Sequence, residues 1–185
     1  VWFNKDIGYW GSGSGGGHFH GGSSYNMAAA FLIAPPGSSD VGQTNAVVYP
    51  LNWWATGAPS DTSLSSIELQ LFYYYGNNSS GQHTNLRTGF FANQLGSSPN
   101  GWHHLAVVND LGGNTLAFYV DGNRVYSGPA LDVSTFGSGA DQGIIKWTFT
   151  GNSTLLNNAW GSMDELYIYQ RALSAAEVQQ LYTSP

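Results

Sequence analysis

The chain has 185 residues, enough for one domain with a sizeable core, and 15% of them are aromatic while only 9% are charged. A disordered chain would not contain so many Trp, Tyr and Phe residues. The chain has only five Lys and Arg residues and a net charge of −6, so nucleic acid and anionic membranes, which need clustered cations, are poor partners. The absence of Cys excludes disulfides and thiolate metal sites, and no apolar run is long enough to span a membrane.

The N-terminal half of the chain is predicted to consist of short strands joined by turns. Residues 1–4 are typical of the end of a strand, and residues 8–22 form a glycine-rich loop without the helix that follows a nucleotide-binding loop. Further strands are expected at 25–34, 40–49, 67–75 and 88–94, with loops between them. In the 67–75 strand, alternation places Leu69 on one face and Glu68 and Gln70 on the other.

The C-terminal half contains the most regular pattern. Strands are expected at 102–108, 115–120, 124–126, 144–149 and 163–169. Asp121-Gly122 suits a type I′ hairpin turn. Short strands at regular intervals, with almost no helix, indicate an antiparallel sandwich of two sheets.

One helix is expected, directly after the last strand. The sequence Ser174-Ala175-Ala176-Glu177 is a capping box, in which the Ser174 hydroxyl and the Glu177 carboxylate each accept a backbone N–H. Leu173 and Val178 flank the cap as a hydrophobic staple does. We therefore predict a helix of about two turns that packs its apolar stripe against a sheet.

Two segments resemble laminin-G-like (LamG) domains, which are concanavalin A-like jelly rolls. They are GWHHLAVV with the following LAFYVDGNRV, and GSMDELYIYQRALSAAEVQQLY near the C-terminus. The resemblance implies an all-β, two-sheet antiparallel jelly-roll β-sandwich with one short C-terminal helix, forming a single domain over residues 1–185. In that family several dozen residues of earlier strands usually precede a segment like Val1 to Asn4, so we expect a longer parent chain or a domain without its first strands.

A catalytic role is weighed first, because related sandwiches include glycan-active enzymes. A retaining glycosidase needs two carboxylates about 5 Å apart, and the concanavalin A-like hydrolases place them on one strand as E-x-D-x-E. No such triplet occurs here. Asp164 and Glu165 are adjacent, so on a strand they would point to opposite faces. We therefore expect the protein not to be an enzyme.

Aromatic residues in predicted loops suggest carbohydrate binding, because sugars stack on exposed rings while amides bind their hydroxyls. Trp2, Trp102 and Trp147 lie on predicted strands and are assigned to the core. The candidate ligand-binding residues are Trp10, Asn52, Trp53, Trp54 and Tyr74. For Trp53 and Trp54, packing in the core is the alternative interpretation.

Two metal sites are considered. On the closing strand of a LamG-like fold, a carboxylate such as Asp164 often supports structural calcium, and bonding to neighbouring backbone amides is the alternative. His18 and His20 would face the same way in an extended segment and could hold zinc, copper or nickel, although no third ligand is apparent.

The leading functional hypothesis is a non-catalytic binding or adhesion module at an extracellular, cell-surface or virion-surface location, with a glycan or a protein surface as partner. Carbohydrate recognition is favoured. The alternative is a structural or assembly subunit of a virion, fibre or surface filament, which self-assembles through an open sheet edge. A glycan-active enzyme is the third hypothesis.

Overall fold

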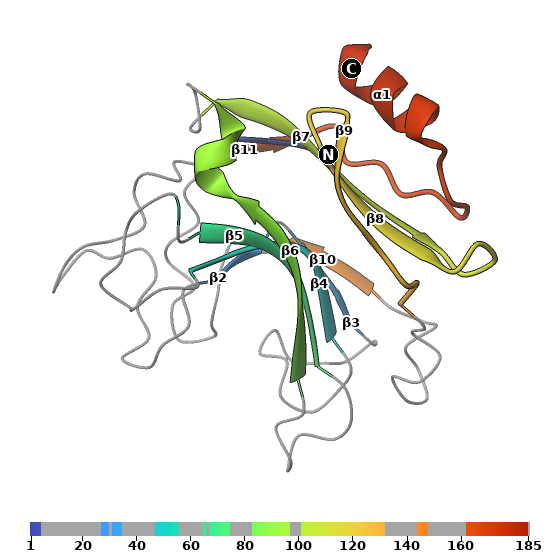
Figure 1. The fold of residues 1–185 in the computed structure, drawn as a ribbon, viewed down its shortest axis with the longest axis horizontal. Coiled ribbons are helices and arrows are strands. Elements are labelled where there is room, and N and C mark those ends of the chain that lie inside the picture. The colour runs from blue at the N-terminus through green and yellow to red at the C-terminus, as the bar shows by residue number, and fades with distance from the viewer. Residues whose placement is uncertain are drawn as a thin grey trace, which may run out of the picture.

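The computed structural model describes residues 1–4, 27–29, 31–34, 47–55, 65, 67–74, 83–96, 101–131, 144–147 and 162–184. In these ranges the chain forms two antiparallel sheets, a short 3₁₀ helix at Ala92–Leu95 and one α-helix (Figure 1). The predicted all-β sandwich with a short C-terminal helix is confirmed.

One sheet has five strands and the other has six. The five-stranded sheet has the order β11 (Ser162–Asp164), β1 (Trp2–Asn4), β7 (Trp102–Asp110), β8 (Thr115–Val120) and β9 (Asn123–Gly128). The six-stranded sheet has the order β10 (Ile144–Trp147), β3 (Phe31–Ala34), β4 (Val47–Ala55), β5 (Ile67–Tyr74) and β6 (His83–Phe91), and β2 (Met27–Ala29) also pairs with β4. Strand β9 contacts β6 and strand β7 contacts β4 between the two sheets.

Strand β8, near the centre of the five-stranded sheet, is buried on both of its faces. Ala117 and Tyr119 of β8 pack against Val178 of the helix, so they occupy the outer face. Leu116 and Phe118 alternate with them, are also buried, and therefore point toward the second sheet. Burial on both sides explains why β8 is a continuous apolar run rather than an alternating one.

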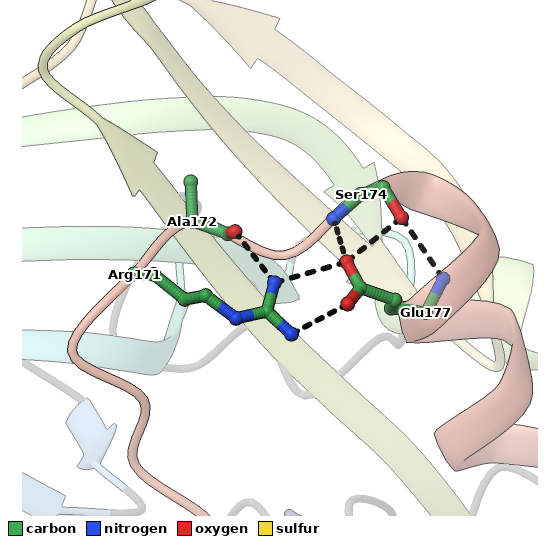
Figure 2. Close-up of polar contacts among 4 residues, drawn as sticks. All are labelled: Arg171, Ala172, Ser174 and Glu177. Atoms are coloured by element: carbon green, nitrogen blue, oxygen red, sulfur yellow. Dashed lines mark hydrogen bonds and ion pairs between the residues drawn. The ribbon is translucent and has the colours of Figure 1, made fainter.

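Helix α1 (Ala175–Thr183) lies across the outer face of this sheet (Figure 1). Its capping box is formed as predicted: Ser174 Oγ accepts from Glu177 N at 3.3 Å, and the Glu177 carboxylate accepts from Ser174 N at 2.8 Å (Figure 2). Leu173 and the fully buried Val178 pack into the same cluster, as the staple predicts.

Strand β4 differs from the prediction. The predicted loop around Trp53 and Trp54 is wrong, because β4 runs through both residues to Ala55. Pro50 lies at a register irregularity between Tyr49 and Asn52, and pairing with β2 and β3 on one side and β5 on the other continues the strand past it. The predicted 25–34 strand is correspondingly divided into β2 and β3, which both pair with β4.

Near the C-terminus, one predicted turn is confirmed and one predicted strand is shorter in the structure. Asp121 and Gly122 have φ values of 50° and 74°, which confirms the tight turn between β8 and β9. The closing strand is shorter than predicted: β11 ends at Asp164, opposite Trp2, and Glu165 has a φ of 51°. Residues 165–173 then lead to the helix without ladder pairing.

Candidate functional site

A buried carboxylate marks the centre of the candidate site. Glu68 on β5 is only 1% exposed. Its Oε1 accepts a hydrogen bond from Gly89 N at 2.7 Å, and its Oε2 accepts from Arg87 Nε at 2.7 Å and from Gln70 Nε2 at 3.0 Å. Three donors surround the carboxylate, which offsets the cost of burying it.

The local backbone of β6 creates this arrangement. The β5–β6 register shifts between Glu68 and Gln70, and Gly89 adopts a φ of 72° at the shift. The irregularity turns the Gly89 N–H toward Glu68, while Thr88 Oγ1 donates to Leu69 O at 2.5 Å. Glycine is required there, because a left-handed φ is costly for other residues.

Two neighbouring groups retain hydrogen-bonding capacity. Gln70 Oε1 is buried and has no partner in the part of the chain that the structure describes. Arg87 reaches Glu68 through Nε, and its two terminal amino groups have no hydrogen bond to any described residue. The Arg87 side chain is 60% exposed, so these donors are accessible from solvent. The Arg87 amino groups therefore provide donors for a polar ligand, whereas Gln70 Oε1 is enclosed by the protein.

The sheet register places three of the predicted site residues on the same face as this cluster. Asn52 is opposite Gln70 and Trp54 is opposite Glu68, so these positions share one face of the sheet. Tyr74 shares that face because it is an even number of residues from Gln70 on β5. Trp53 is opposite Leu69 and therefore lies on the other, apolar face. Trp10, His18 and His20 lie outside the described residues.

The structure confirms the predicted alternation of β5, but the sequence pattern does not predict the buried cluster of Glu68, Gln70 and Arg87. A polar residue on one face of a strand is ordinarily read as solvent-exposed, whereas Glu68 and Gln70 are both buried. The available signal was the Arg87-Thr88-Gly89 sequence, in which a cation precedes a glycine by two positions near a Glu-x-Gln strand. That signal is weak without the pairing of β5 with β6.

The remaining predicted residues are less informative. Asp164 is exposed, and its Oδ1 accepts from Glu165 N at 2.9 Å, the bonding considered above as the alternative to calcium. Glu165 accepts a hydrogen bond from Tyr167 Oη. Within the described ranges no three His, Asp or Glu side chains cluster in a way that could hold a metal ion. Calcium at Asp164 therefore stays a prediction. Trp102, assigned above to the core, is 47% exposed.

Comparisons with known proteins agree with this architecture. A laminin-G-type family model, described as the concanavalin A-like lectin/glucanases superfamily, matches residues 36–179. No curated protein matches the chain. No helix among the described residues has the length and apolar character needed to cross a membrane.

Two solved structures are similar to the chain at low identity. The binding domain of Paraclostridial Mosquitocidal Protein 1 is 19% identical with a TM-score of 0.41, and the match covers 85% of this chain and 37% of that one. An S-layer domain-containing protein (residues 221–444) from Clostridium thermocellum ATCC 27405 is 22% identical with a TM-score of 0.33, over 81% of this chain and 63% of that one. At TM-scores below 0.5, nothing about the function of this chain follows from either structure.

Proposed function

The chain belongs to the concanavalin A-like lectin/glucanase superfamily, and we propose that it is a non-catalytic carbohydrate-binding module that acts outside the cytoplasm. The observation that carries the proposal is the shared sheet face of Asn52, Trp54, Glu68 and Gln70. This face places an aromatic residue and an amide residue beside the exposed Arg87 guanidinium, opposite Gln70, and such a combination can bind the apolar and hydroxyl surfaces of a sugar.

The hydrogen-bonding state of the cluster supports a neutral, hydroxyl-rich ligand. The free amino groups of Arg87 can donate to the hydroxyl or ring oxygens of such a ligand. Since Glu68 already offsets the charge of Arg87, the site does not require an anionic ligand.

The arrangement of carboxylates supports binding rather than hydrolysis. Glycoside hydrolysis ordinarily uses two carboxyl groups that flank the scissile bond. Among the residues that the structure describes on this face, Glu68 is the one carboxylate, and three protein donors already occupy its oxygens. Such a group serves to position its neighbours.

Glycan-array binding followed by titration calorimetry tests the proposal. The wild-type protein is expected to bind at least one glycan, and Trp54→Ala and Arg87→Ala are expected to weaken that binding about tenfold or more. Trp102→Ala is the matched control, because it removes a half-exposed indole from the other sheet. Loss of binding in this control but not in Trp54→Ala, or no glycan binding by the wild type, would sink the proposal.

A further inference from the structure

The orientation of the Arg87 side chain is set by its contact with Glu68. Arg87 Nε donates to Glu68 Oε2 at 2.7 Å, and the structure gives Arg87 no other ion pair with a described residue. Two further bonds hold the carboxylate in place, from Gly89 N to Oε1 at 2.7 Å and from Gln70 Nε2 to Oε2 at 3.0 Å. Glu68 is therefore a fixed, buried anchor that holds the exposed arginine by its inner nitrogen.

This contact leaves the outer end of the guanidinium unused. An arginine commonly meets a carboxylate through two parallel hydrogen bonds. Here the second carboxylate oxygen accepts from Gly89 N, which the bulge at a φ of 72° turns inward, and Arg87 makes a single bond through Nε. Its two terminal amino groups have no partner among the described residues, and its side chain is exposed. A pair of parallel N–H donors thus faces solvent in a plane that Glu68 restrains.

The charge around Arg87 decides which acceptors suit this pair. A sugar offers two neighbouring acceptor oxygens either as a carboxylate or as two hydroxyls on adjacent ring carbons. Glu68 already offsets the charge of Arg87, and the chain carries a net charge of −6, so its field disfavours an anionic sugar. A pair of hydroxyls meets no such repulsion, and it is the better match.

We propose that Arg87 selects the ligand: its two terminal amino groups bind two adjacent hydroxyl oxygens of a neutral sugar, and Glu68 positions them to do so. The inference rests on the carbohydrate-binding role proposed above and narrows it to sugars that have such a pair. The sheet register supports this placement. Arg87 is opposite Gln70, which is opposite Asn52, so the guanidinium lies on the sheet face that also holds the position of Trp54.

NMR titration of the whole chain with the methyl glycosides of glucose, galactose, mannose and xylose tests the inference, because each sugar has adjacent hydroxyls. A monodeoxy analogue that lacks either oxygen of the bound pair is expected to bind about tenfold more weakly, and one that lacks a different hydroxyl to stay within about twofold. Equal binding of all the monodeoxy analogues would overturn the inference. So would tighter binding of the glucuronic acid glycoside than of the glucose glycoside.

Arg87→Lys keeps the positive charge but cannot supply two donors in a fixed plane. In this variant each methyl glycoside and its deoxy analogues are expected to bind within about twofold of one another. Arg124→Lys is the matched control, because it makes the same change at an exposed arginine on β9 of the other sheet. A folded Arg87→Lys variant that still discriminates about tenfold, or a control that does not, would contradict the assignment.

The side-chain N–H signals of Arg87 report the positioning role of Glu68 in the wild-type protein. The Nε–H is expected to exchange with water about tenfold more slowly than that of Arg124, because a buried carboxylate accepts it. Addition of a methyl glycoside is expected to shift the signals of the terminal amino groups and to leave the Nε–H protected. Glu68→Gln is expected to lose both this protection and the discrimination against deoxy analogues. Equal exchange at Arg87 and Arg124 would overturn the positioning role.

Failure of this inference is distinguishable from failure of the carbohydrate-binding role. A protein that binds on the glycan array, but binds none of these methyl glycosides or does not discriminate among their deoxy analogues, would overturn the pairing with Arg87 and leave carbohydrate binding intact. A protein that binds no glycan in either experiment would overturn both.

Discussion

The Trp2 ring stacks on the Tyr182 ring, with centroids 5.7 Å apart and an interplanar angle of 27°. The contact joins β1 to the last turn of α1 across the outer face of the five-stranded sheet. The His104 ring is adjacent to both, with its centroid 5.5 Å from that of Trp2 and 6.3 Å from that of Tyr182. The three rings therefore form one cluster that connects two distant parts of the chain.

Tyr182→Ala is expected to destabilise the protein by about 2 kcal/mol, because it removes a partly buried ring from this cluster. Tyr182→Phe keeps the ring and is expected to change the free energy of unfolding by less than about 0.5 kcal/mol. Guanidinium denaturation monitored by Trp fluorescence measures both. Equal losses in the two variants would show that the hydroxyl, rather than the stacking, carries the effect.

His104 is expected to make stability depend on pH. Burial lowers the pKa of His104 to about 4, from an ordinary value of 6.5. The unfolded chain therefore binds a proton on this residue before the folded protein does, so stability is fully present above pH 6.5 and falls as the pH is lowered toward 4. Thermal unfolding across this range is the measurement.

His104→Phe is the matched variant, because it keeps an aromatic ring and removes the buried Nδ1, which has no partner among the described residues. The dependence on pH between about 4 and 6.5 is expected to shrink relative to the wild type. A variant with the same dependence would assign the effect to another group.

The helix cap has a separate dependence on pH. A hydrogen bond from Arg171, followed by bonds from Ser174, lowers the pKa of Glu177 to about 2, from an ordinary value of 4.5. The stabilisation is thus present above pH 4.5 and lost as the pH falls toward 2. Glu177→Gln is expected to remove this dependence in thermal unfolding, and Ser174→Ala to cost about 1 kcal/mol at neutral pH. Ser184→Ala, at the other end of the helix, serves as the control.

Glu68→Ala is expected to cost about 2–3 kcal/mol, because it leaves the Gly89 N–H and the Gln70 amide group without their acceptor. Glu68→Gln keeps an acceptor for Gly89 and is expected to cost about half as much. Urea denaturation distinguishes the two. Indistinguishable midpoints would mean that the charge, rather than the accepted hydrogen bonds, stabilises the bulge.

Features that depend on neighbouring residues were predictable from the sequence. The Ser174 capping box and the Asp121-Gly122 turn need only a few adjacent residues, and both are present. The course of β4 past Pro50 was not predictable, because strands far away in the sequence pair with it on both sides. The burial of Glu68 was not predictable either, because it depends on a bulge in the partner strand β6. The exposure of Trp102, at 47%, was not predictable from its position on a strand.

The bulge that holds Glu68 also has a consequence for solubility. Strand β6 is at the margin of the six-stranded sheet, where a long flat strand would invite aggregation between molecules. The irregular backbone at Gly89 bends this margin, and the exposed Arg87 adds a charge to it, two devices that discourage unwanted edge-to-edge pairing. A substitution that flattens β6 is therefore expected to promote association between molecules, which appears as turbidity at high protein concentration.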